Sequence, residues 1–240
     1  MALIKDIRFI EDYNIPVQET IVVDTNILLF HYNRATQVDE MNQTYQAYWY
    51  PRFLKKLIEN KNRLLTTYLN LAEFCSVVER NEFKIYNSNL SRRNRLNLKE
   101  FRDLAYERDI YTSNIKHGLL EIKQYIDDVY EITHDYSVVN SFVQALPETH
   151  CDIADYTVIE YMKSLGITNF ISDDKDFTTV NGITLYTTYK DSHYQTQSTG
   201  ARSSSPNSDR SGTRSSGSNT NLGRLNVFSS SRAQSHSQSH

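Results

Sequence analysis

Short β-branched runs alternate along this chain with longer amphipathic stretches. Runs at 19–24, 63–67, 129–132, 169–172 and 182–186 predict strands, the last of them at an edge of the sheet. The stretch at 25–30 predicts a turn that leads into a helix, and 70–78 predicts the start of a long helix. Stretches at 50–60, 138–146 and 152–165 predict further helices, with Pro147 and Gly166 suited to the ends of the last two. Asn70, followed three residues later by Glu73, has the pattern of a capping box. The alternation predicts an α/β fold with a mainly parallel central sheet.

Composition divides the chain into one domain, 1–194, and a tail, 195–240. The tail consists of Ser, Asn, Gly, Gln and Arg with few apolar residues, which cannot offset the entropy of ordering it, so we expect it to be disordered. Within the domain, the charged stretch at about 81–127 predicts a helical insertion. The net charge of −3 combines a basic tail with an acidic domain, which disfavours broad nucleic-acid binding but permits a local carboxylate cluster.

The bulk sequence also excludes several classes of protein. Two cysteines, Cys75 and Cys151, are too few for a disulfide framework or a zinc site, and we expect both to be buried, inert thiols. No apolar run is long enough to cross a membrane, and the N-terminus lacks the apolar core of a signal peptide. We therefore expect a cytoplasmic protein without a membrane partner.

Four acidic residues stand where an α/β fold gathers its ligands. Asp24 ends a predicted strand, Asp174 follows another, and Glu73 and Asp155 come early in predicted helices. Because ligands of such folds bind outside the carboxyl ends of the strands, these acids should face one crevice. Carboxylates that close repel one another unless a cation lies between them, and Mg²⁺ or Mn²⁺ prefers such oxygen ligands. The pattern predicts a metal site of the kind that hydrolyses phosphodiesters.

At these positions the sequence resembles the PIN domain nucleases, a family that includes the toxin ribonucleases of bacterial toxin–antitoxin pairs. The likeness spans roughly residues 19–190. It lies in four segments: Ile21–Leu28, Asn70–Phe74, Asp152–Gly166 and Phe170–Phe177. The third segment departs from the family pattern, because Tyr156 and Thr157 replace small residues after the acid, and the segment at 81–127 makes the body longer than that of the compact toxins.

The resemblance implies a three-layer α/β/α fold and assigns roles to the acids. Asp24, Glu73, Asp155 and Asp174 would be the catalytic metal ligands, with Asn26 and Ser172 as supporting polar residues. Asp152 and Asp173 are alternative ligands, because Asp152 lies one helical turn before Asp155 and a shift of one residue would exchange Asp173 with Asp174.

By the same resemblance, the function would be that of an endoribonuclease that uses Mg²⁺ or Mn²⁺ to cut RNA. It could act as a toxin with an antitoxin partner, and a homodimer is expected. One alternative is a PIN-like module that binds RNA or protein without catalysis. A phosphatase of the haloacid dehalogenase type would need a second Asp two residues after the first, where this chain has Asn26.

One dense basic patch stands apart from the acids, with Arg92, Arg93 and Arg95 at its centre. It could contact the RNA backbone next to an acidic active site. The alternative is a solvated helical face, because acids at 100, 103 and 107 follow closely.

Overall fold

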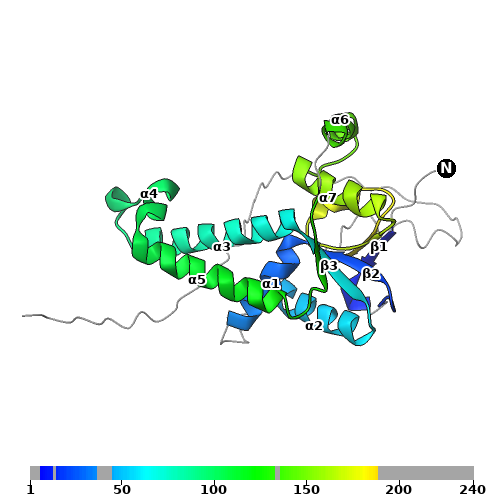
Figure 1. The fold of residues 1–240 in the computed structure, drawn as a ribbon, viewed down its shortest axis with the longest axis horizontal. Coiled ribbons are helices and arrows are strands. Elements are labelled where there is room, and N and C mark those ends of the chain that lie inside the picture. The colour runs from blue at the N-terminus through cyan, green and yellow to red at the C-terminus, as the bar shows by residue number, and fades with distance from the viewer. Residues whose placement is uncertain (1–5, 13–14, 37–44, 133–135, 189–240) are drawn as a thin grey trace, which may run out of the picture.

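One parallel sheet forms the centre of the structure (Figure 1). The computed structural model describes residues 6–12, 15–36, 45–132 and 136–188, so the tail expected at 195–240 lies outside the described residues. Six strands lie in the order β1-β6-β5-β2-β3-β4, and every neighbouring pair is parallel. The strands are β1 (Asp6–Phe9), β2 (Thr20–Val23), β3 (Arg63–Thr67), β4 (Asp128–Tyr130), β5 (Asn169–Ile171) and β6 (Thr184–Thr187).

Helices cover both faces of this sheet. They are α1 (Thr25–Thr36), α2 (Tyr45–Glu59), α3 (Tyr68–Ser88), α4 (Leu98–Asp103), α5 (Ala105–Ile122), α6 (Tyr136–Ala145) and α7 (Ile153–Ser164), with 3-10 turns η1 (Ile10–Asp12), η3 (Arg92–Asn94) and η4 (Lys175–Thr179). Successive residues of β2 pack on opposite faces: Ile21 and Val23 join the core formed with α1 and α2, whereas Val22 joins the core formed with α7. The predicted three-layer α/β/α fold is confirmed.

The direction in which the sheet grows reverses at β2. The chain adds β3 and then β4 on one side of β2, and later adds β5 and β6 on the other. The carboxyl ends of β2 and β5 are therefore neighbours, and the amide N of Asp24 donates to the carbonyl O of Ile171 at 3.1 Å. Open α/β sheets bind their ligands at such a reversal point.

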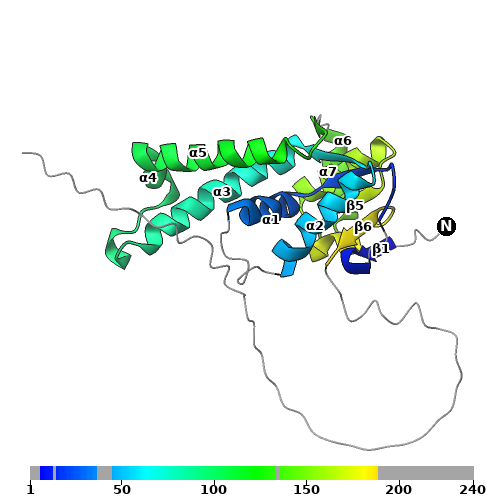
Figure 2. The ribbon, with the colours of Figure 1, turned by 90° about the horizontal axis from the view of Figure 1, so that it is seen from below.

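Two long helices extend the molecule beyond the sheet. Helices α3 and α5 run side by side away from the strands and carry α4 at their far end, and we call these three helices the arm (Figures 1 and 2). At about 1.5 Å per residue, α3 alone spans roughly 32 Å. Gly118 lets α5 approach Phe74 of α3, and Phe101 of α4 is fully buried at the far end. The arm includes the segment for which the sequence predicted helices.

The edge of the sheet differs from the prediction. The sequence placed the last strand at an edge, but β6 lies inside the sheet because β1, which was not predicted, pairs with it. Leu185 and Tyr186 are accordingly buried. All four residues of β1 are only half-buried, so its sequence lacks the alternation of buried and exposed positions that marks a strand.

The start of α3 also differs from the prediction. Its N-cap is Thr67, whose side chain accepts a hydrogen bond from the amide N of Asn70, so Asn70 lies within the helix rather than capping it. Thr67 combines a strand end with a capping hydroxyl, which satisfies a free amide of the first turn.

Both cysteines are free thiols, and only one of them is buried as expected. Cys151 is buried, whereas Cys75 is half-buried. No helix in the described part of the chain is long and apolar enough to cross a membrane.

Candidate metal centre

Five carboxylates line one pocket at the carboxyl ends of β2 and β5. We call it the acidic pocket, and it encloses about 460 Å³. Its acids come from four places in the sequence: Asp24 after β2, Glu73 in α3, Asp152 and Asp155 at the start of α7, and Asp174 after β5. Its other lining residues are uncharged: Thr25, Asn26, Leu29, Leu69, Asn70, Ala154 and Val158. The acidic pocket therefore concentrates negative charge with no lining cation.

Asp24 is the most firmly held of these acids. Its Oδ2 accepts from the hydroxyl of Ser172 at 2.6 Å. Its Oδ1 accepts from the amide N of Thr25 at 2.7 Å and from the side-chain amide of Asn70 at 3.0 Å. Only 6% of Asp24 is exposed. Three donors from three different elements thus fix the direction of one carboxylate at the floor of the acidic pocket.

Ser172 connects Asp24 to the loop after β5. Its Oγ accepts from the amide N of Asp174 at 3.0 Å and from the side-chain amide of Asn26 at 3.3 Å. The Oδ1 of Asn26 in turn accepts from the amide N of Asp173 at 3.3 Å. The two residues expected to support the acids therefore join the ends of β2 and β5 through side-chain hydrogen bonds.

Asp173 and Asp174, which the sequence left interchangeable, point to different surroundings. Asp174 lines the acidic pocket, and its Oδ1 accepts from the amide N of Asp176 at the start of η4. The Oδ1 of Asp173 instead accepts from the hydroxyl of Tyr50 in α2, at 2.7 Å, and from the hydroxyl of Thr188. The geometry places Asp173 against the helix layer and not among the pocket-lining acids.

The other three acids of the acidic pocket come from α3 and from the start of α7. Glu73 is exposed and lies on the second turn of α3, so it can move more freely than Asp24. Asp152 is the N-cap of α7, and its Oδ1 accepts from the amide N of Ala154 and of Asp155. Asp155 is half-buried in the first turn of that helix. The N-terminus of α7 thus directs two carboxylates at the acidic pocket, where the helix dipole favours negative charge.

Two of the acids respond strongly to this crowding. The pKa of Asp24 is raised to about 7, chiefly by burial and also by the charges of Glu73 and Asp174, while the hydrogen bonds from Ser172 and Thr25 oppose the shift. The pKa of Asp155 is likewise raised to about 7, chiefly by burial and also by the charge of every other acid of the pocket, that of Asp152 most strongly. Without a cation, this arrangement disfavours full ionisation.

The donor set has the chemistry that Mg²⁺ or Mn²⁺ requires. As the side chains stand, no group of three or more His, Cys, Asp or Glu residues in the described ranges forms a complete set of metal ligands. Mg²⁺ does not need one, because it keeps several waters and takes one or two carboxylates directly. The five acids around one cavity fit a partly hydrated divalent ion of this kind.

Asn70 is the residue of this site whose role the sequence did not reveal. It is 4% exposed, and its side-chain amide donates both to Asp24 and, at 3.2 Å, to the hydroxyl of Thr25. An asparagine near a helix start resembles a cap, and only the packing of α3 against the end of β2 reveals the second role. Arg92, Arg93 and Arg95 lie elsewhere, around η3 at the far end of the arm.

Comparison with known proteins assigns no family to the chain. No protein-family model matches it, and no curated protein does. A structural match is the VapBC2 complex from Rickettsia felis bound to a DNA fragment from its promoter. That match has 12% sequence identity and a TM-score of 0.43, and it covers 70% of this chain and 98% of the other. At this identity and TM-score, the likeness assigns neither a family nor an activity.

Proposed function

We propose that this chain is a divalent-metal-dependent endoribonuclease that uses Mg²⁺ or Mn²⁺ in the acidic pocket. The observation that carries the proposal is the convergence of five carboxylates from four sequence segments, without a lining cation, at the reversal point of the sheet. Structural acids are usually paired with Arg or Lys. A cluster that excludes both suits a site in which a metal ion supplies the positive charge.

The roles of the acids follow from how firmly each is held. Asp24, with three donors, would be the fixed ligand, and Asp174 lies on a loop that Ser172 ties to it. Glu73 and Asp155 come from separate helices and would complete the set. When bound, the divalent ion supplies Lewis-acid chemistry, which lowers the pKa of water and neutralises charge on a phosphodiester. No nucleophilic Ser or Cys is required.

RNA as the substrate, and a PIN-like identity, rest on the order of the four motifs in the sequence. Asp24 with Asn26, then Glu73, then Asp155, then Ser172 with Asp174 occur in the order found in PIN nucleases. Asn26 stands where a haloacid dehalogenase would have its second acid, and its side chain serves as a hydrogen-bond bridge to Ser172. A toxin role with an antitoxin partner, and a homodimer, belong to the same proposal.

Cleavage of labelled RNA with Mn²⁺ or Mg²⁺, with and without EDTA, tests the activity. We expect EDTA to abolish cleavage, and we expect Asp24→Asn and Asp174→Asn each to lower the rate by at least about 100-fold, because each removes a charged ligand. Asp109→Asn is the matched control, since Asp109 is an exposed acid of α5 outside the acidic pocket. Equal cleavage by all of these variants would refute the assignment.

A binding module without catalysis is the second candidate function. The observation that favours it is the exposure of Glu73, because a loosely held acid is a weaker metal ligand than a fixed one. Calorimetric titration with Mn²⁺ separates the two. A nuclease site should take up Mn²⁺ in a way that Asp24→Asn abolishes, whereas a binding module should show no uptake that depends on the carboxylates. Growth arrest on expression, relieved by a neighbouring reading frame, would support the toxin role.

A further inference from the structure

One face of α3 changes from acidic to basic along its length. Glu73 lines the acidic pocket and is exposed. At 100° per residue, Arg80 and Lys84 lie within about 20° of Glu73 around the helix axis. Both are exposed. The two residues, which we call the basic face of α3, therefore continue the line that leaves the acidic pocket.

The acids of α3 beyond Glu73 do not lie on this face. Glu79 and Glu82 are about 120° and 180° away around the helix. Glu79 accepts two hydrogen bonds from Arg102 of α4, both at 2.6 Å, and Glu82 accepts one from the side-chain amide of Asn114 of α5 at 2.8 Å. Contacts inside the arm thus engage both carboxylates, and positive charge dominates the outer face of α3.

A second group of cations follows the C-terminal end of α3 in the sequence. The Nε of Arg80 donates to the carbonyl O of Ser76 at 3.2 Å, so its guanidinium lies over the preceding turn of α3. Beyond the end of α3, Arg92, Arg93 and Arg95 are all exposed around η3. We call these three residues the tip. The ion pairs of the described residues involve none of the five cations.

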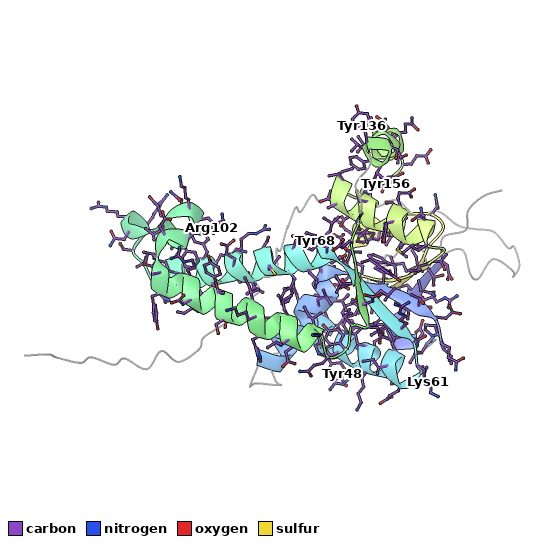
Figure 3. The ribbon with its side chains drawn as sticks, in the orientation of Figure 1. Tyr48, Lys61, Tyr68, Arg102, Tyr136 and Tyr156 are labelled. Atoms are coloured by element: carbon purple, nitrogen blue, oxygen red, sulfur yellow. The ribbon has the colours of Figure 1, made fainter. Side chains whose placement is uncertain are left out.

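The spacing of these cations suits the phosphates of a nucleic-acid strand. At about 1.5 Å per residue, Arg80 and Lys84 lie roughly 10 and 16 Å along α3 from Glu73, and the helix ends at about 22 Å. Figure 3 shows Tyr68 at the sheet end of α3 and Arg102 at the far end of the arm. A stacked strand rises about 3.4 Å per nucleotide, so this distance corresponds to about six nucleotides.

We propose that the arm guides single-stranded RNA, with the basic face of α3 and the tip binding the backbone phosphates of the segment that leaves the acidic pocket. This inference rests on the proposed ribonuclease function, because it takes the acidic pocket as the place where the strand is cut. It extends that function, since it names the path of the substrate along the arm and the length of strand, about six nucleotides, that α3 spans beyond Glu73. A cationic track also offsets the repulsion between an acidic domain and a polyanion.

Binding measured without cleavage tests the path independently of the activity. Fluorescence anisotropy in EDTA would compare the wild-type protein with Arg80→Gln/Lys84→Gln, and separately with the tip variant Arg92→Gln/Arg93→Gln/Arg95→Gln. The matched control is Lys116→Gln/Lys123→Gln, which removes two exposed cations, one in α5 and one at its C-cap. The probes are single-stranded RNAs of about 4 and about 16 nucleotides, a DNA strand of the longer length, and its duplex.

For the longer RNA, we expect the α3 double variant to lose affinity on the order of tenfold, and the control to stay within about twofold of the wild type. The salt dependence of log K should fall by about 1.4 for the α3 variant and about 2 for the tip variant, because each lost phosphate contact removes about 0.7. The shorter RNA should discriminate the tip variant from the wild type poorly, since it cannot reach the tip.

Three results would overturn the path. They are equal losses in the α3 variant and the control, wild-type affinity that does not rise with RNA length, and binding of the duplex as tight as that of the single strand. Weaker binding of the DNA strand supports RNA as the ligand. If no variant or metal condition gives cleavage while the binding pattern holds, the proposed function fails and the path stands.

Discussion

Asp24→Asn should stabilise the metal-free protein, although it should abolish the proposed activity. The substitution is isosteric, and the Asn Oδ1 can still accept from the amide N of Thr25 and the side chain of Asn70. What changes is the charge. The ordinary pKa of an aspartate is 3.8, whereas burial among other acids raises that of Asp24 to about 7. Folding therefore has to overcome the cost of an ionised Asp24 whenever no cation is bound.

The size of the effect follows from this pKa. Between pH 4 and pH 7 the folded protein keeps a proton on Asp24 that the unfolded chain releases, so the wild type loses stability as the pH rises through that window. At pH 8 the cost is about 4 kcal/mol, and at pH 5 it is below about 2 kcal/mol. The Asn amide must then face the Oγ of Ser172, which already accepts two other hydrogen bonds, at a cost of about 1 kcal/mol.

The net gain should be about 3 kcal/mol at pH 8 and less than about 1 kcal/mol at pH 5. For a domain of this size that corresponds to a rise in Tm of roughly 6–12 °C at pH 8. Thermal unfolding in EDTA, followed by circular dichroism at both pH values, measures it. Adding Mn²⁺ should then raise the Tm of the wild type and leave that of Asp24→Asn unchanged, because binding to the folded state alone stabilises it.

Two results would refute this reasoning. One is an Asp24→Asn variant no more stable than the wild type at pH 8 in EDTA. The other is a gain of equal size at pH 5 and pH 8, which would show that packing rather than charge is responsible. Asp109→Asn, at an exposed acid of α5, should show no pH-dependent difference from the wild type.

Two further predictions concern the arm and the loop after β5. Gly118→Ala should destabilise the protein by about 1–2 kcal/mol in urea unfolding, because a Cβ would lie 2.5 Å from the Cζ of Phe74. Helix propensity alone would instead stabilise it by about 1 kcal/mol, so a measured gain in stability would contradict the close packing of α5 on α3. Asp173→Ala should lower stability by about 1–3 kcal/mol, through loss of the acceptor for Tyr50, and keep the affinity for Mn²⁺. Asp174→Asn, whose Oδ1 can still accept from the amide N of Asp176, should keep the stability and lose the affinity. Calorimetry showing the opposite order would contradict the placement of the two acids.

Much of the fold was predictable because its central elements are strongly patterned. The run that ends at Asp24 is buried on both faces, and such a run needs no partner to be recognised as an interior strand of a parallel sheet. β3 was predicted at its observed bounds for the same reason. The acids that follow β2 and β5 could be expected to share a crevice, since the carboxyl ends of parallel strands lie at one edge of the sheet.

The features that could not be predicted from the sequence arise from contacts between segments that are far apart in the chain. β1 contributes four half-buried residues and becomes a strand only because Asp6–Phe9 align with Thr184–Thr187 of β6. Its pairing in turn makes β6 an interior strand. Asn70 has the same character, since its contact with Asp24 spans residues far apart in the chain. Local propensity cannot report interactions that exist only between distant segments.

The ambiguity between Asp173 and Asp174 shows where such reasoning reaches its limit. Within β5, Phe170 and Ile171 face opposite sides of the sheet, and the two acids lie after the strand ends at Ile171. Ile171 packs with the core that contains Tyr50, and Phe170 packs with the core under α7. The helix that covers each face of the sheet is set by the route of the chain, which the sequence does not show. In the structure Asp173 bonds to Tyr50 of α2, on the side of Ile171, whereas Asp174 lines the acidic pocket together with Asp155 of α7.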